Sequence, residues 1–207
     1  MDRDVGADVV SRRSSWVRRL RTDAGTFYLK CYEYSSWGDR IQNWAKWTAP
    51  WRKSRAAREC EAFAWLAERG FPAPAHFACL ERRRAGFLVG ATILTSAAPG
   101  FSADRLLESA TPEQRTQTAR AIGRFVRALH LAGFRDRNLD LRNLIVAGER
   151  IVKIDSPRHR IVPPETAEDA LARADWARLL PQLAAYGVAE DAAGAGSDGA
   201  ASLGPRD

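Results

Sequence analysis

Alternating apolar and polar residues predict two pairs of antiparallel strands in the first half of the chain. Residues 14–34, SSWVRRLRTDAGTFYLKCYEY, read as two strands joined by the turn TDAG. Successive side chains of a strand point to opposite faces, so Lys30 lies on the face opposite that of Phe27 and Leu29. Residues 73–96 read as a second pair around the sequence ERRRAG, whose arginine run is expected to be a solvated loop.

Between these two pairs, apolar residues recur at helical spacing. The pattern predicts a helix over residues 54–69 that ends at Gly70. Phe63 and Leu66 belong to its apolar stripe, and Glu59 lies on the same side of the helix. The carboxylate of Glu59 therefore points inward and requires a partner, because burying an unpaired charge costs several kcal/mol.

The clearest helix of the second half begins at residue 111. Thr111 and Gln114 form a capping box at its start, and Gly133 ends it. Residues 143–155, NLIVAGERIVKID, read as a short hairpin. Residues 166–184 read as a last helix.

The order of these elements, strands first and helices later, indicates an α+β fold with two lobes. We expect an N-terminal segment at 1–14, a strand-rich N-lobe at 15–98 and a mainly helical C-lobe at 99–186. Residues 187–207 are rich in small residues and are expected to form a disordered tail.

Composition limits the partners and the compartment. The net charge is +7, which favours anionic partners such as nucleotide phosphates, nucleic acid or an anionic membrane surface. Cys31, Cys60 and Cys79 lie far apart without metal-ligand spacing, so neither a disulfide framework nor a zinc site is expected. No signal-peptide pattern is visible, and no run approaches the roughly 18 apolar residues that a membrane-spanning helix requires. A cytoplasmic protein is therefore expected.

Three tryptophans follow the first strand pair. Trp44, Trp47 and Trp51 lie at helical spacing among several Arg and Lys residues. One interpretation is a core stripe, and the other is an anchor at a membrane interface, where Trp beside cations is favourable. The sequence alone leaves both open.

Four polar features stand in an order that is typical of protein kinases. Lys30 lies in the middle of a strand, Glu59 points inward from the next helix, residues 135–143 form a polar loop, and Asp155 closes a hairpin. In kinases a strand Lys paired with a helix Glu holds the nucleotide phosphates, a loop supplies the base and a metal ligand, and a later Asp binds Mg²⁺.

Residues 15–160 resemble the Kdo/heptose lipopolysaccharide kinase family. The resemblance is carried by FYLKCYEYSSWGDRIQNW, ARECEAFAWLAERGFPAP, ALHLAGFRDRNLDLRNLIV and VKIDSPR. It implies a protein-kinase-like fold with a small antiparallel-sheet N-lobe carrying one long helix and a truncated, mainly helical C-lobe. It also implies ATP and Mg²⁺ as cofactors, bound between the lobes, and transfer of phosphate to a sugar hydroxyl of the lipopolysaccharide core.

The resemblance assigns roles to residues at matching positions. Lys30 matches the nucleotide-binding Lys, and Glu59 matches its ion-pair partner. Asn143 and Asp155 match the two metal-binding residues. Asp175 is similar to the helix Asp that braces the catalytic loop in the family.

The expected catalytic base departs from the kinase pattern H-R-D-L-x-x-x-N. Counting back from Asn143, the position of the base Asp holds Asn138, and the His position holds Asp136. A carboxylate can accept a proton whereas a neutral amide cannot, so we expect Asp140, two residues after Asn138, to act as the base. Asp136 is the alternative base, and a pseudokinase acting as a binding or scaffold module is the alternative function.

The acceptor implied by the resemblance is an anionic glycolipid or lipopolysaccharide core, with peripheral contact on the cytoplasmic face of the inner membrane. Arg135, Arg137 and Arg142 flank the transfer site and either bind acceptor phosphate or carboxylate, or pair with the Asp residues of the loop and with the last helix. A small-molecule kinase with the same fold is a further alternative. No nucleic-acid motif is recognisable, so nucleic acid is not an expected partner.

Overall fold

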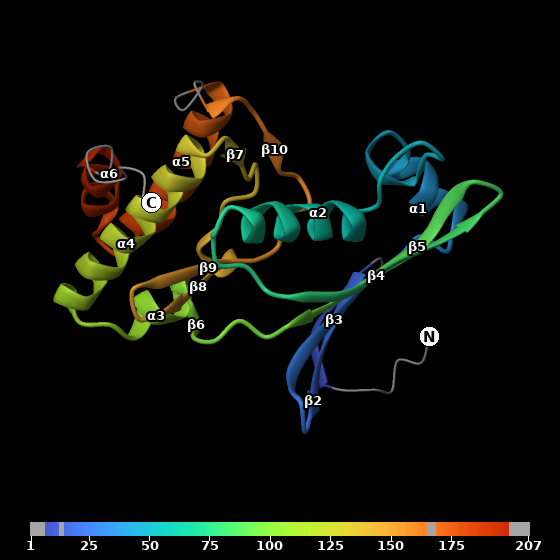
Figure 1. Cartoon of the computed structure of the whole chain (residues 1–207), viewed down its shortest axis with the longest axis horizontal. Coiled ribbons are helices and arrows are strands. Elements are labelled where there is room, and N and C mark those ends of the chain that lie inside the picture. Colours follow the sequence, from blue (N-terminus) through green and yellow to red (C-terminus); the bar gives the residue numbers. More distant parts are fainter. Residues whose placement is uncertain (1–6, 13–14, 165–168, 199–207) are drawn as a thin grey trace. The chain divides into compact units, whose positions relative to one another are not determined.

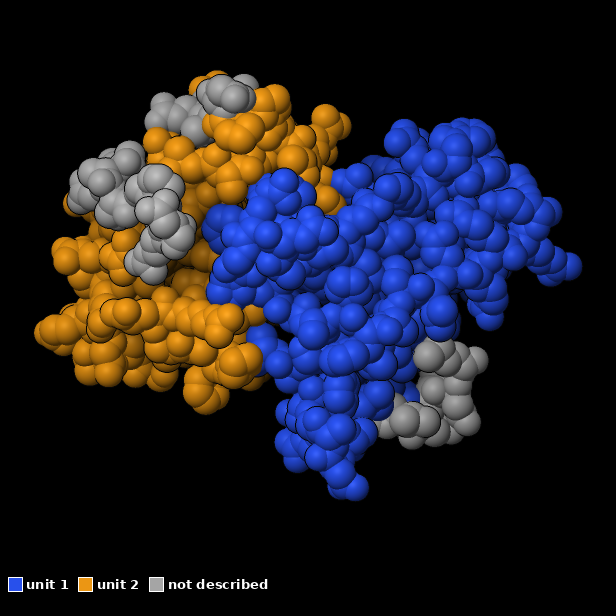
Figure 2. All heavy atoms as spheres, in the orientation of Figure 1, with its two compact units in different colours: residues 1–98 blue, residues 99–207 orange. Residues whose placement is uncertain are grey.

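The computed structural model describes residues 7–12, 15–164 and 169–198. The chain divides into two units, residues 1–98 and 99–207 (Figures 1 and 2). Each unit is described by itself below. The fold is mixed, with an antiparallel sheet in the first unit and mainly helices in the second, as the sequence predicts.

The first unit contains one antiparallel sheet in the order β1-β2-β3-β5-β4. Both predicted strand pairs are present, and β3 lies in the middle, with Lys30 opposite Val17 of β2 and Ile93 of β5. Strand β1 falls in the segment for which no strand was predicted, and it pairs with β2. The strands are β1 (Ala7–Arg12), β2 (Ser15–Thr22), β3 (Gly25–Glu33), β4 (His76–Arg84) and β5 (Phe87–Ser96).

The long helix of this unit is α2 (Arg55–Glu68), one residue shorter at each end than predicted. The Ser54 hydroxyl caps it by accepting a hydrogen bond from the Ala57 N–H at 3.0 Å. Phe63 and Leu66 are buried, and so is Glu59 at 4% exposure. The Glu59 carboxylate therefore lies on the core side of the helix, where it requires a partner of opposite charge.

The three tryptophans do not share one environment. A short helix, α1 (Trp37–Gln42), is followed by a π-helical turn over Trp44–Thr48. Trp47 is buried among core residues, whereas Trp44 is 36% and Trp51 is 73% exposed. The core interpretation holds for Trp47 alone, because the turn directs the other two rings outward.

The arginine run is solvated as expected, with Arg82 and Arg84 exposed, but the expectation of a loop is wrong. Residues 82–84 belong to β4, and the turn contains only Ala85 and Gly86, both with positive φ. The Arg83 guanidinium donates to Glu81 Oε2 and to backbone carbonyls of residues 50, 52 and 86. Its planar set of donors thus ties the strand to the segment before α2.

The second unit is built around the predicted helix α4. Thr111 and Gln114 form the capping box expected from the sequence. Two small antiparallel sheets accompany the helices, in the orders β6-β8-β9 and β10-β7. The helices are α3 (Ala103–Ser109), α4 (Pro112–Leu131), α5 (Ala170–Ala184) and α6 (Ala189–Asp198), and the strands are β6 (Phe101–Ser102), β7 (Phe134–Arg135), β8 (Leu144–Ala147), β9 (Arg150–Lys153) and β10 (Arg160–Ile161).

The expectation of disorder from residue 187 onward is wrong for residues 189–198, which form α6. This helix packs along α4 (Figure 1), and Ala192 is fully buried. Close approach is possible because α4 has a glycine there: a Cβ on Gly123 would lie 2.1 Å from the Ala192 carbonyl oxygen. The small residues that suggested disorder in the sequence are those that allow the two helices to pack closely. The remaining tail, 199–207, lies outside the described residues.

A helix that crosses a bilayer must be both long and apolar. None of the described helices, over 7–12, 15–164 and 169–198, combines the length and apolarity needed for a membrane span.

Candidate active site

The structure brings Lys30 and Glu59 together as an ion pair. Lys30 Nζ lies 3.0 Å from Glu59 Oε2 and 3.3 Å from Oε1. The hydroxyl of Tyr32 donates to the same carboxylate at 3.3 Å. The side chain of Lys30 is 19% exposed and that of Glu59 is 5% exposed. The nearly buried carboxylate therefore fixes the ammonium group of a side chain that is still partly exposed.

In the second unit, α5 holds the loop that contains Asp136 and Asn138. The backbone N–H groups of Asp136 and Arg137 donate to the two carboxylate oxygens of Asp175, at 2.9 and 2.8 Å. Asp175 is buried, and His130 Nε2 lies 3.3 Å from it. Arg137 has a positive φ of 58°, a conformation that is costly for a residue with a side chain. The Asp175 contacts offset that cost and fix the path of the loop.

Asp136, the alternative base, is enclosed. Its side chain is 2% exposed and lies 3.2 Å from the ammonium of Lys153, which is fully buried. Burial raises the pKa of the Asp136 carboxyl, and the nearby Lys153 charge opposes that rise. Because Lys153 ends β9, the pair ties the loop to the strand that leads into Asp155. Asp136 thus acts as an internal support and is closed to an acceptor hydroxyl.

Replacement of Lys153 by methionine is expected to lower the free energy of unfolding by about 3 kcal/mol. The reason is that Asp136 would then be a buried carboxyl without its cation. Urea unfolding monitored by circular dichroism measures the change. The double variant Lys153→Met/Asp136→Leu should recover most of the loss. Equal instability of the single and double variants would contradict a supporting role for the pair.

Asp140, the expected base, has a different environment. Arg142 contacts it twice through its guanidinium, Nε to Oδ1 at 2.9 Å and Nη2 to Oδ2 at 2.8 Å. The Arg142 N–H also donates to Oδ1 at 3.0 Å. These bonds lower the pKa of Asp140, so its carboxylate is ionised at neutral pH. The Arg142 side chain is 71% exposed and that of Asp140 is 12% exposed. Asp140 is therefore ionised, its side chain is 12% exposed, and its carboxylate is paired with the guanidinium of Arg142.

A backbone hydrogen bond brings together the segments that carry Asn143 and Asp155, the two residues expected to bind metal. The Asn143 carbonyl accepts from the N–H of Ile154, the residue before Asp155, at 3.0 Å. The Asn143 amide donates to the Asn138 carbonyl at 3.4 Å. Asp155 has a positive φ of 57°. An amide oxygen and a carboxylate are hard oxygen donors, and Mg²⁺ commonly binds one or two such groups together with substrate phosphates. The donor set fits Mg²⁺.

The arginines around the loop have separate roles. Arg135 is fully buried and donates to Asp169 and to the carbonyls of His130 and Phe134, so it is structural. Arg142 pairs with Asp140. Arg137 is exposed. Of the two interpretations open from the sequence, pairing within the protein holds for Arg135 and Arg142.

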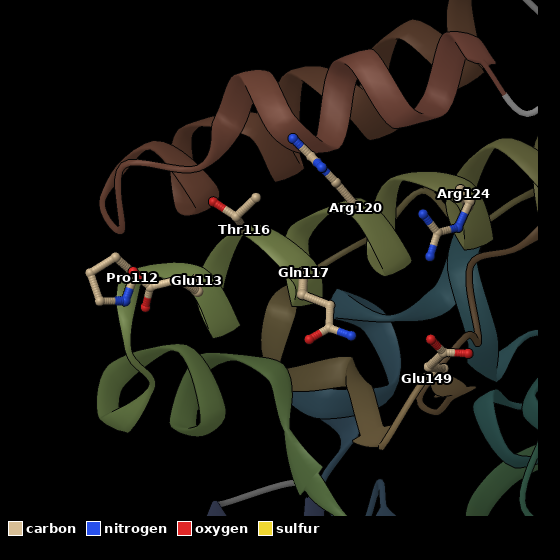
Figure 3. Close-up of a pocket in the computed structure, with 7 residues that line it drawn as sticks. All are labelled: Pro112, Glu113, Thr116, Gln117, Arg120, Arg124 and Glu149. Carbon is tan, nitrogen blue, oxygen red and sulfur yellow. The ribbon is translucent and has the colours of Figure 1, made fainter.

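A pocket of about 560 Å³ lies elsewhere in the second unit, along α4 and the β8–β9 turn (Figure 3). Arg120, one of the cations that line it, is paired with Asp191 of α6. None of the candidate site residues lines it. The lining residues are Pro112, Glu113, Thr116, Gln117, Arg120, Arg124 and Glu149.

The sequence matches the lipopolysaccharide kinase (Kdo/WaaP) family over residues 7–180. The chain belongs to this family. The matched residues include every candidate site residue, from Lys30 to Asp175.

A solved structure described as WaaP in complex with acyl carrier protein has a similar fold, with a TM-score of 0.58. It is 18% identical and the alignment covers 84% of this chain and 69% of that one. The likeness confirms the kinase fold predicted from the sequence. No curated protein matches the chain.

Sequence reasoning missed Lys153, the partner of Asp136. A signal was present: in RIVKID the lysine is enclosed by aliphatic residues of a four-residue strand. A lysine at such a position needs a buried anion, and Asp136 was already a candidate for a different role.

Proposed function

We propose that this lipopolysaccharide kinase family member transfers the γ-phosphoryl group of ATP to a sugar hydroxyl of the lipopolysaccharide core, Kdo or heptose, or of a similar glycolipid. The observation that carries the proposal is the ion pair between Lys30 and Glu59, 3.0 Å apart. A strand Lys paired with a helix Glu is the arrangement with which protein kinases hold nucleotide phosphates.

The remaining roles follow from the second unit. Asn143 and Asp155 would hold Mg²⁺, which neutralises charge on the phosphates when bound. Asp175 and the pair of Asp136 with Lys153 would position the loop. Asp140 would orient the acceptor hydroxyl and accept its proton, because its carboxylate is the more exposed of the two, 12% against 2% for the side chain of Asp136. With such an acceptor, the activity would take place at the cytoplasmic face of the inner membrane.

A second candidate function is a pseudokinase that binds nucleotide without turnover. Two observations favour it: Asn138 stands where the base is expected, and Asp140 is bound by the guanidinium of Arg142. Nucleotide binding depends on groups that position the phosphates and stabilise their charge, and not on the base. Loss of the base would therefore lower the rate of transfer and leave nucleotide binding in place.

The test is an assay with the purified full-length chain, Mg²⁺, γ-labelled ATP and a lipopolysaccharide-core acceptor. We expect label in the glycolipid, and Asp155→Asn should lower the rate at least about 100-fold by removing a metal ligand's charge. Glu149→Gln, an exposed carboxylate at the β8–β9 turn, is the matched control and should leave the rate unchanged. The proposal is wrong if the unmodified protein neither binds nucleotide nor transfers phosphate.

A further inference from the structure

Exposed rings from two segments of the first unit meet on one surface. The Trp37 and Phe87 centroids are 6.2 Å apart, Trp44 and Phe87 are 5.2 Å apart, and Trp44 and Trp51 are 5.8 Å apart. Trp37 is 65% exposed and Trp51 is 73% exposed. These four residues, called the aromatic patch, form a chain of ring contacts that is open to solvent. Large exposed rings that contact one another mark interaction surfaces.

The charge of the segment around the aromatic patch is mainly positive, although Asp39 lies two residues after Trp37 and Glu61 pairs with Lys53. Residues 40–58 contain no Asp or Glu. In the described part of the chain, the exposed side chains of Lys46 and Arg52 make no ion pair or hydrogen bond, so their charges are available to a partner. The cations of this segment are Arg40, Lys46, Arg52, Lys53, Arg55 and Arg58.

The backbone that carries the rings is held in place. The Thr48 hydroxyl donates to the Arg40 carbonyl at 2.6 Å, and Trp47 is buried beneath the segment at 7% exposure. Arg83 donates to the carbonyls of Pro50 and Arg52 at 3.2 and 2.7 Å. The patch is thus presented by an ordered segment, which reduces the entropy lost when a partner binds.

We propose that the aromatic patch docks this protein on an anionic lipid bilayer. Tryptophan rings are favoured at the boundary between headgroups and acyl chains, and Lys and Arg beside them attract anionic lipids. A second copy of the chain is a poor occupant, because two faces with cations and no acidic residue in residues 40–58 would repel each other. The docking deepens the proposed function, on which it rests only for the identity of the acceptor as a membrane glycolipid.

The test uses the full-length protein and sedimentation with vesicles of phosphatidylcholine alone or with phosphatidylglycerol. We expect binding to the anionic vesicles that weakens as salt rises. Trp37→Ala/Trp51→Ala should lower the partition coefficient at least about tenfold. Leu80→Ala, which removes a side chain that is 62% exposed on β4, is the matched apolar control and should bind normally.

The electrostatic part has its own pair of variants. Lys46→Gln/Arg52→Gln should lower binding to anionic vesicles roughly 30-fold, about fivefold for each cation removed. Arg105→Gln/Arg150→Gln removes two exposed cations of the second unit and should have little effect. Quenching of tryptophan fluorescence by brominated lipid in the unmodified protein checks the geometry without any substitution.

The outcomes separate docking from catalysis. Vesicle binding is measured without nucleotide, and Lys30→Met should bind vesicles as the unmodified protein does, so a failed kinase assay leaves the docking result intact. Absence of binding to anionic vesicles overturns the proposal. Equal binding by the patch variants and their controls also overturns it, as does dimerisation or capture of an acidic protein through the patch without lipid binding.

Discussion

Replacement of Lys30 by methionine is expected to lower the rate of phosphoryl transfer by about 10²–10³-fold. Methionine keeps the apolar stem of the side chain and removes the ammonium that lies 3.0 Å from Glu59. The transition state then loses a fixed positive charge where the phosphates are held. Steady-state kinetics give the rate, and calorimetric titration with nucleotide gives the affinity, which should weaken as well.

The chain offers a matched control in a second Lys–Glu pair of the same unit. Lys53 and Glu61 are also paired, but their side chains are 64% and 40% exposed. An exposed pair contributes little to stability, so Lys53→Met should leave both activity and unfolding nearly unchanged. If Lys53→Met lowered transfer as much as Lys30→Met does, a nonspecific loss of positive charge would explain both, and the nucleotide role of Lys30 would have to be abandoned.

Stability distinguishes the chemical role of Lys30 from its structural one. Lys30→Met removes the cation beside the Glu59 carboxylate, whose side chain is 5% exposed, and should cost about 2 kcal/mol of unfolding free energy. The double variant Lys30→Met/Glu59→Gln should regain part of this stability, because a neutral amide is less costly to bury. It should regain no activity. Recovery of both would mean that the single variant was inactive because it was unfolded.

The parts of the fold that could be predicted from the sequence are those set by short-range patterns. The Thr111 cap uses a side chain three residues from its partner and is present. The helix predicted from Ser54 begins at Arg55. The inward direction of Glu59 follows from helical spacing, and its ion pair with Lys30 follows from the cost of burying a lone charge. In each case the relevant partner lies within the same element or is required by charge.

What could not be predicted depends on contacts between distant segments. The pairing of Asp136 with Lys153 needs the loop and β9 to meet in the folded unit. Helix α6 can pack only because Gly123, more than sixty residues earlier in the chain, leaves room for it, so its own composition does not reveal the helix. The pair of Asp140 and Arg142 is local, but either residue had a plausible external partner, so spacing could not choose between them.

Asp140→Asn is expected to lower the turnover number about 100-fold while nucleotide affinity stays within about threefold. The amide has nearly the same shape and can still orient a hydroxyl, but it cannot accept the proton. Single-turnover kinetics with saturating ATP measure the effect. The matched variant is Arg142→Gln, which breaks the same ion pair from its exposed end and leaves the carboxylate in place.

The two variants distinguish a base from a structural pair. If Asp140 only caps the turn at Leu141–Asn143, breaking the pair from either side should have similar effects on activity. If Asp140 is the base, Arg142→Gln should retain much more activity than Asp140→Asn, because the carboxylate is then freed. Asn138→Asp supplies the missing third case: a carboxylate at the kinase position should rescue Asp140→Asn. Turnover that is absent in the unmodified protein and arises only with Asn138→Asp would instead identify a pseudokinase, in which substitution at residue 138 removed the base and Asp140 never replaced it.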